Sequence, residues 1–484
     1  MDFRHLSDGI DLHSSHHRPG APALSSVDTS PHSLIDTGDD SAGNGGEGYF
    51  FGSLVNAPVA IYTPINIAIG SFNSTAEAVQ WSTVQTDQSA TQIAGVGGDG
   101  GNGNASIGGN ITALGFNSSE SGLISSGGNQ AGNGGDGFSH GSFVNASFVL
   151  YHPISIAVAG PDSSGHADQA NYADIDQSAI QMAGIGGNGG NGNAASGGNV
   201  SSGLGSGSGS IDTGDNSAGN GGDGYFFGSL LSAPIVIYMP INIAIAGYNS
   251  IADAHQSNNV SFDQSVTQLA GIGGDGGNNN MSIGGNGTAL GFGKGWFDAG
   301  ELSNGSNDAG NGGDGSFYGS IVHAPFVLYD PINIAIAGPN STAEADQTNY
   351  VNIDQSAFQM AGIGGNGGSG NAALGGNIHF LDFFASDFGF GSDAINAGHN
   401  GAGNGGSGHF SGSLIETSIA VYAPVNIAIA GYNSVADALQ ANHVHFDQSV
   451  MQMAALGRDG GDSNLAIGGD VASHFQPDHH LLLG

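Results

Sequence analysis

The sequence predicts an all-β protein, either a tandem-repeat array or a β-solenoid-like stack of five modules, with glycine-rich turns or polyglycine-II segments. Three observations predict it. A short phrase recurs five times at nearly constant spacing, polar and apolar residues alternate with period two over long stretches, and 90 of the 484 residues are glycine. A fixed period is the signature of a repeat architecture, and period-two alternation is typical of strands rather than helices.

The repeats keep a fixed internal spacing. The phrase INIAIG after Pro64 returns after Pro153, Pro240, Pro331 and Pro424, at steps of 89, 87, 91 and 93 residues. In every repeat an AGNGG asparagine lies 20 residues before the proline, a DQS aspartate lies 23 after it, and a closing Asn or Asp lies 46 after it. All variation in length therefore falls between the repeats, which indicates one packed unit per repeat.

This spacing divides the chain into seven parts. Segments between the repeats, such as 111–130 and 200–217, are rich in Ser, Gly and Asn and are expected to be flexible linkers. The expected organisation is a flexible N-terminal segment 1–41, repeats at 42–110, 131–199, 218–286, 309–377 and 402–470, and a C-terminal tail 471–484.

Two strands are expected in each repeat. Alternate residues from Ala252 to Ala270 share one face, and because this run exceeds the usual strand length we expect it to bend. The INIAIAG segment forms a second strand with its isoleucines on one face and its Asn and Ala residues on the other. These segments are the expected assembly strands. Their isoleucines are Ile65, Ile67, Ile69, Ile241, Ile243, Ile245, Ile332, Ile334 and Ile336.

Three glutamines hold the same places in every repeat. They either stack on their equivalents in the next repeat, exchanging amide hydrogen bonds as in cross-β ladders, or form a plain polar face exposed to solvent. They are Gln80, Gln88, Gln92, Gln169, Gln177, Gln181, Gln256, Gln264, Gln268, Gln347, Gln355, Gln359, Gln440, Gln448 and Gln452. The aromatic triplets at 49–51 and 225–227 either stack between repeats or anchor a partner, and we favour stacking.

The alternation of Ala, Gln, Asn and apolar residues that closes on Q-x-x-x-Q-x-A-G resembles the curlin-type repeats of bacterial amyloid fibres. The resemblance covers only part of each repeat, since the glycine tracts and the proline lie outside it. It implies extracellular assembly.

The glycine tracts, such as 97–103, form either tight solenoid corners or polyproline-II-like helices that associate through their backbones. The GGDG tetrads at Asp136, Asp223 and Asp314 resemble the Gly-Asp turns of repeats-in-toxin proteins, which implies a possible calcium site. The alternative is that these carboxylates cap backbone amides.

Charge excludes several partners. With 41 acidic and 4 basic side chains the formal net charge is −37, so we expect no binding to nucleic acid, which requires clustered Lys or Arg. The most apolar window, 143–159, is broken by polar residues and proline, so we expect no membrane insertion. Residues 1–30 lack the pattern of a cleaved signal peptide, and acidic, glycine-rich composition resembles that of type I secretion substrates.

No catalytic motif is found. No nucleophile recurs with a base and an orienting group, and no phosphate-binding loop ends in Lys. We therefore expect no enzyme, and no cofactor apart from the possible calcium. The sequence favours an extracellular structural protein that assembles with itself into a fibre, surface layer or biofilm matrix. The alternative is a repeat adhesin that binds a surface or glycan, with calcium as a candidate stabilising ion.

Overall fold

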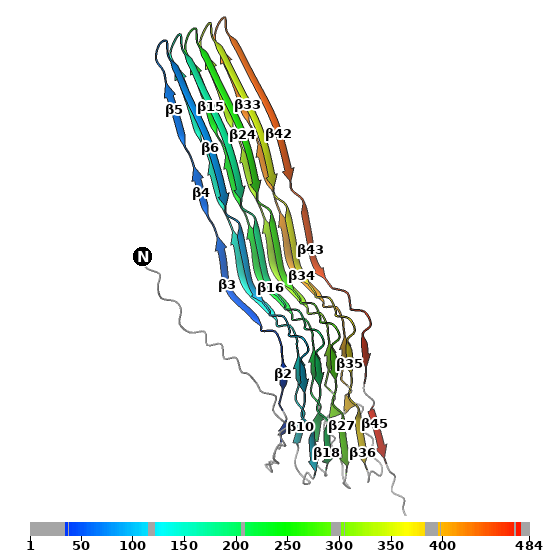
Figure 1. The fold of residues 1–484 in the computed structure, drawn as a ribbon. Coiled ribbons are helices and arrows are strands. Elements are labelled where there is room, and N and C mark those ends of the chain that lie inside the picture. The colour runs from blue at the N-terminus through cyan, green and yellow to red at the C-terminus, as the bar shows by residue number, and fades with distance from the viewer. Residues whose placement is uncertain are drawn as a thin grey trace, which may run out of the picture.

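The computed structural model describes residues 34–36, 38–114, 122–204, 209–291, 302–303, 305–382, 395–396, 398–468 and 471–475. Most of the expected N-terminal segment and C-terminal tail lies outside these residues. The described part of the chain contains strands and no helix, and it forms an elongated stack of five layers (Figure 1). Each layer is one repeat and contributes nine strands.

The strands follow the same order in every layer. Layer 1 contains β1 (Leu34–Asp36), β2 (Asp40–Ala42), β3 (Gly48–Asn56), β4 (Val59–Tyr62), β5 (Ile65–Ile69), β6 (Thr75–Asp87), β7 (Ala90–Val96), β8 (Ala105–Ile107) and β9 (Ile111–Leu114). Layer 2 contains β10 (Gly122–Ser125), β11 (Asn129–Ala131), β12 (Gly137–Asn145), β13 (Phe148–Tyr151), β14 (Ile154–Ala159), β15 (Ser164–Asp176), β16 (Ala179–Ile185), β17 (Ala194–Ser196) and β18 (Val200–Leu204). Layer 3 contains β19 (Gly209–Asp212), β20 (Asn216–Ala218), β21 (Gly224–Ser232), β22 (Ile235–Tyr238), β23 (Ile241–Ala246), β24 (Ile251–Asp263), β25 (Val266–Ile272), β26 (Met281–Ile283) and β27 (Gly287–Gly291). Layer 4 contains β28 (Leu302–Ser303), β29 (Asn307–Ala309), β30 (Gly315–His323), β31 (Phe326–Tyr329), β32 (Ile332–Ala337), β33 (Thr342–Asp354), β34 (Ala357–Ile363), β35 (Ala372–Leu374) and β36 (Ile378–Asp382). Layer 5 contains β37 (Ile395–Asn396), β38 (Asn400–Ala402), β39 (Gly408–Glu416), β40 (Ile419–Tyr422), β41 (Val425–Ala430), β42 (Val435–Asp447), β43 (Val450–Leu456), β44 (Leu465–Ile467) and β45 (Val471–Phe475).

Nine parallel sheets of five strands each run along the stack. Every strand pairs with the equivalent strand of the adjacent layer, and the register aligns equivalent residues, as in Gln169 with Gln256 and Gln256 with Gln347. The all-β repeat class is therefore confirmed, in the form of a β-solenoid-like stack. Segments 111–130 and 200–217 differ from the expected flexible linkers, because β9, β10, β11, β18 and β19 lie within them and pair between layers.

Within a layer the chain runs out along β3, β4 and β5, turns at residues 70–74, and returns along β6 and β7 (Figure 1). We call the sheets of the outgoing strands the first wall and those of the returning strands the second wall. Each turn contains an Asn or Asp residue with positive φ, such as Asn249 at 53°, a conformation that these short polar residues tolerate. The expected bend in the long alternating run occurs at the DQS triplet, between β24 and β25.

The core lies between the two walls. All alternate residues from Ala252 to Ala270 point into it and are buried, while the intervening residues point outward. Alanines fill the core near the turn. Tyrosines such as Tyr238 and aromatic or branched residues such as Phe262 fill its middle, and phenylalanines such as Phe226 pack against alanines at its base.

The glycine tracts bond with a period of three residues. In layer 2, Gly186 and Gly189 donate their backbone N–H to layer 3, while Gly187 donates to Gly135 in the facing tract of its own layer, at 2.8 to 2.9 Å. Every third side chain, such as that of Asn188, is exposed. Three residues per turn without internal hydrogen bonds is the polyproline-II geometry, so the tracts form polyglycine-II-like segments rather than turns alone.

This packing leaves no room for side chains at the bonded positions. A Cβ on Gly187 would lie 2.1 Å from the carbonyl oxygen of Gly98. We predict that Gly187→Ala destabilises the stack by about 1–3 kcal/mol, since inserting atoms into a close-packed site forces backbone shifts. Asn188→Ala, one residue away at an exposed position, is the matched control and should change stability by less. Urea unfolding measures both, and equal effects would contradict the polyglycine-II packing.

Candidate assembly surfaces

The structure places the repeated glutamines in three ladders along the core. In each ladder the Nε2 of one layer donates to the Oε1 of the preceding layer, at 2.6 to 2.9 Å. The glutamines of the inner layers are buried, so they are not a solvent-exposed polar face. The amide is self-complementary, because it donates to one neighbour and accepts from the other.

A further ladder, formed by tyrosines, was not predicted from the sequence. Tyr151, Tyr238 and Tyr329 stack with ring centroids 4.8 and 4.9 Å apart. Each hydroxyl donates to an asparagine Oδ1 of its own layer, as Tyr238 does to Asn258 at 2.8 Å. Burial raises the pKa of Tyr238, so its hydroxyl stays a donor. The signal was present in the sequence, since a tyrosine stands two residues before the proline of every repeat.

The aromatic triplets also stack across layers. Phe226 contacts Phe317 in the core at 5.5 Å between centroids, and Phe227 contacts Tyr318 on the outer side at 4.8 Å. Within each triplet, alternate residues therefore point into the core and towards the outer surface.

The second wall is offset along the stack relative to the first wall. The evidence is the asparagine of the INIAIA strand, whose side chain bridges two layers. Asn242 Nδ2 donates to His255 O in its own layer at 2.9 Å and to Ala167 O in the preceding layer at 2.6 Å. Each first-wall strand thus contacts the second-wall strands of two layers, its own and the preceding one.

This offset leaves the two ends of the stack unfinished in complementary ways. At layer 1, Asn66 Nδ2 bonds to Val79 O of its own layer, and no preceding layer is present among the described residues. At layer 5, the inward face of β42 lacks a following first wall, so Phe446 is 42 % exposed where its equivalent Phe262 is 0 % exposed. Among the described residues, the first wall is therefore uncovered at one end of the stack and the second wall at the other.

The isoleucines of the expected assembly strands point outward from the first wall. Asn242, Ala244 and Ala246 face the core, whereas Ile241, Ile243 and Ile245 lie on the outer surface. In layer 1 the exposure is larger, with Ile65 at 64 % and Ile69 at 79 %. The alternation of the sequence separated the two faces, and the structure shows that the smaller side chains form the core.

The three aspartates proposed for calcium lie in one column. Asp136 accepts a hydrogen bond from the backbone N–H of Asp223 at 2.9 Å, and Asp223 accepts from that of Asp314 at 2.7 Å. Burial and the neighbouring carboxylates raise the pKa of Asp136. These bonds are those expected of capping carboxylates. No group of three or more His, Asp or Glu side chains arranged to hold a metal ion occurs in the described ranges, and calcium binding stays a prediction.

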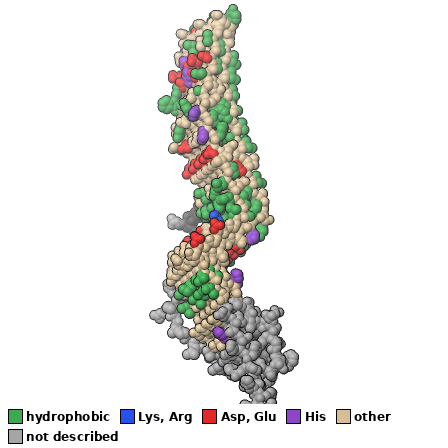
Figure 2. All heavy atoms as spheres, turned by 90° about the vertical axis from the view of Figure 1, so that its right-hand side faces the viewer, with side chains coloured by type: hydrophobic (Ala, Val, Ile, Leu, Met, Phe, Trp, Pro, Cys, Tyr) green, Lys and Arg blue, Asp and Glu red, His purple; other side chains and the backbone are tan. Residues whose placement is uncertain are grey.

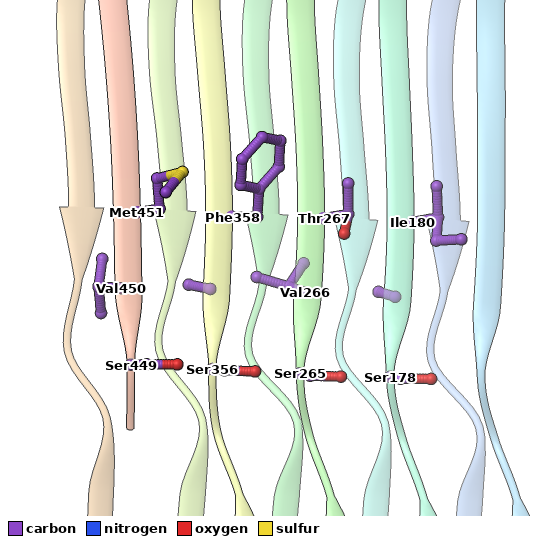
Figure 3. Close-up of a pocket in the computed structure, with 12 residues that line it drawn as sticks. Ser178, Ile180, Ser265, Val266, Thr267, Ser356, Phe358, Ser449, Val450 and Met451 are labelled. Atoms are coloured by element: carbon purple, nitrogen blue, oxygen red, sulfur yellow. The ribbon is translucent and has the colours of Figure 1, made fainter. Parts of the chain in front are cut away.

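The outer face of the second wall carries acidic rows together with exposed apolar side chains such as Trp81. His166 and His255 both contact Asp253, at 3.3 and 2.9 Å. An open groove of about 560 Å³ crosses the layers at the DQS bend. Figure 3 shows Ser178, Ser265, Ser356 and Ser449 pointing the same way in a row along this groove.

One column of the core is titratable. The position of Asn145 is occupied by Ser232, His323 and Glu416 in the following layers. Burial lowers the pKa of His323 to about 4, and burial raises the pKa of Glu416.

Comparisons with protein-family models, curated proteins and solved structures find no match for this chain. Among the described residues, no helix is long and apolar enough to cross a membrane. The expectation that the protein is not an enzyme stays a prediction.

We predict that Gln264→Met destabilises the protein by about 1–3 kcal/mol, because Gln177 Oε1 and Gln355 Nε2 each lose their partner inside the core. Gln85→Met, at an exposed position of the second wall, is the control and should be nearly neutral. Thermal unfolding of the two variants measures the difference. A neutral Gln264→Met would show that the ladders do not stabilise the stack.

We also predict that His323 lowers the stability of the protein as the pH falls from 6.5 to 4. The unfolded chain protonates His323 near its ordinary pKa of 6.5, whereas the folded chain resists protonation until about pH 4. The unfolded state therefore binds more protons in this window, and the stability present above pH 6.5 falls by up to about 3 kcal/mol as the pH drops.

His323→Asn tests this assignment, because asparagines already stack in that column, Asn56 Nδ2 donating to Asn145 Oδ1 at 3.0 Å. The raised pKa of Glu416 has the opposite effect on the pH dependence of stability, and Glu416 is present in both the parent and the variant. Urea midpoints at pH 7.5 and pH 4.5 should diverge less in the variant than in the parent. An unchanged pH dependence would assign it to other groups.

Proposed function

We propose that this protein is a structural subunit that assembles end to end into a filament, and that it serves outside the cell as a fibre, surface layer or biofilm-matrix component. The observation that carries the proposal is the complementarity of the two unfinished ends. Repeat proteins that stay monomeric need capping repeats with a polar outer face. The described residues of layers 1 and 5 instead present the ladder and core positions of inner layers.

A second copy placed after layer 5 would repeat the contacts of the interior. Asn66 of the incoming copy would donate to Ala438 O, as Asn242 donates to Ala167 O within the stack. Gln80 Nε2 would donate to Gln440 Oε1, continuing the ladder in the direction that all its inner bonds follow. The first wall of the incoming copy would cover Phe446.

Such a joint does not close on itself. It brings together two different surfaces of the subunit, and a heterologous contact without closing rotation propagates into a filament. The extracellular setting rests on the resemblance of the glutamine-bearing strands to curlin-type repeats.

A repeat adhesin is the second candidate. The observation that favours it is the open groove at the DQS bend, with its row of serines (Figure 3). A monomeric adhesin would hold a glycan or solid surface along that groove and would not form filaments.

The test is electron microscopy of the full chain and of the triple variant Gln80→Glu, Gln88→Glu, Gln92→Glu. In the parent we expect filaments with a regular axial repeat. In the variant each carboxylate still accepts the amide of layer 2, but it presents an oxygen instead of an N–H to the Oε1 atoms of the next copy. Filaments should therefore be absent. The fold should persist at reduced stability, because the variant also loses the bonds that Gln80 Nε2 and Gln92 Nε2 donate to Pro64 O and Val144 O within the chain.

Gln85→Glu is the matched control, because it adds a charge to the same layer on the outer face of the second wall. It should form filaments like the parent. Parallel samples with millimolar calcium and with chelator show whether the aspartate column takes part. Monodisperse single particles of the parent under both conditions would contradict the proposal, and glycan-array binding by those particles would support the adhesin.

A further inference from the structure

The outer face of the first wall is an apolar surface shared by all five layers. It is formed by alternate residues from Val55 to Ile69 in layer 1 and by their equivalents in the other layers. We call it the apolar face. In the five layers its polar members are Thr63, His152, Asp330 and Thr417. Figure 2 shows hydrophobic side chains along one long edge of the upper part of the molecule, with acidic and histidine side chains towards the other edge.

The size of the apolar face exceeds that of ordinary surface patches. A strip of roughly 15 residues and five strands spans about 50 Å by 24 Å at strand geometry. That is about 1,200 Å² on one copy, against a largest patch of about 300–600 Å² on a typical monomer. Pairing two such faces would bury about 2,400 Å², more than the roughly 1,200–2,000 Å² of a standard stable interface.

We propose that two copies of this chain pair through their apolar faces, wall against wall. This interface is separate from the end-to-end joint and does not depend on it. A second copy is the occupant that fits, because its layers repeat at the same spacing of about 4.8 Å, so that each layer of one copy can lie opposite a layer of the other.

The polar members of the face select the orientation of the pair. A two-fold axis along the strands, passing through layer 3, brings layer 2 of one copy opposite layer 4 of the other. His152 and Asp330 occupy the same strand position in layers 2 and 4, with Met239 between them in layer 3. The axis therefore sets each His152 opposite an Asp330 of the partner, twice per pair, and Met239 opposite itself.

The charge distribution supports the same arrangement. The acidic rows, such as the one that contains Asp176, Asp263 and Asp354, lie on the outer face of the second wall. In the pair, four sheets separate the two acidic faces by roughly 30 Å at about 10 Å per sheet packing. This is well beyond the Debye length of about 8 Å at physiological salt, so pairing brings little repulsion.

The test starts from the triple variant Gln80→Glu, Gln88→Glu, Gln92→Glu, in which end-to-end assembly is blocked. We call it the background variant and measure its mass by analytical ultracentrifugation. We expect a species of twice 47.9 kDa. Adding Ile243→Lys, at the centre of the apolar face, should give a monomer. Adding Ser257→Lys, exposed on the second wall of the same layer, is the matched control and should leave the pair intact.

A charge swap tests the orientation. His152→Asp alone should weaken pairing at least tenfold, because it sets two carboxylates opposite each other twice, and His152→Asp with Asp330→His should restore it. A monomer in the background variant up to 100 µM, or pairing that Ile243→Lys leaves unchanged, would overturn the proposal, and binding of that monomer to phosphatidylcholine vesicles would assign the face to lipid. Pairing that His152→Asp leaves unchanged would overturn the two-fold arrangement.

The two assemblies fail in different ways. In micrographs of the parent, filaments one subunit wide would overturn the lateral pairing alone. Paired particles without filaments would overturn the end-to-end proposal alone.

Discussion

Parallel, in-register pairing of equivalent residues is the constraint on which the rest of this structure depends. Each residue stacks on its own equivalent in the next repeat, about 4.8 Å away. Most positions inside the core therefore hold a side chain that packs against a copy of itself. Alanine and phenylalanine do so by shape, tyrosine by stacking, and glutamine and asparagine by donating to one neighbour while accepting from the other. This requirement also explains the fixed internal spacing, since one inserted residue would move every later side chain out of its column.

The same constraint determines where charge can lie. Like charges directly opposite each other on neighbouring strands are destabilising, yet a complete aspartate row runs through the DQS triplets. These carboxylates lie at the outward bend and accept the backbone N–H two residues on, as Asp263 does from Ser265 at 2.9 Å. The hydrogen bond favours the ionised form and offsets part of the repulsion. In layer 1, the hydrogen bonds that Asp87 accepts from the hydroxyl and the backbone N–H of Ser89 lower the pKa of Asp87.

Much of this fold could be predicted from the sequence because its signals are periodic. The five repeats correctly predict five layers. The alternation from Ala252 to Ala270 correctly predicts which residues of the second wall point inward. Three features could not be predicted. The role of Ile243 depends on which face of a strand is covered, and alternation alone does not decide that. The strands at 111–114 and 122–125 have four residues each, too few to give a clear alternation, and each pairs with its equivalent in the next layer. The offset between the walls, and with it the complementary ends, is a property of packing that no single segment contains.

End-to-end assembly, as proposed, would repeat the interlayer contacts that form when the chain folds. An inner layer such as layer 3 has a neighbour on each side, whereas layers 1 and 5 have one within the chain. In a stack whose stability is a sum of layer and interface contributions, the end layers are the least stable. A joint between two copies would add one interface of the interior type, with its ladder bonds and its cover for Phe446. The contacts that favour extending the stack would then match those that favour adding a layer within it, whereas joining two copies also costs their translational and rotational freedom. The net charge of −37 opposes this through long-range repulsion that salt screens, so the ionic conditions around the chain would set how far the stack extends.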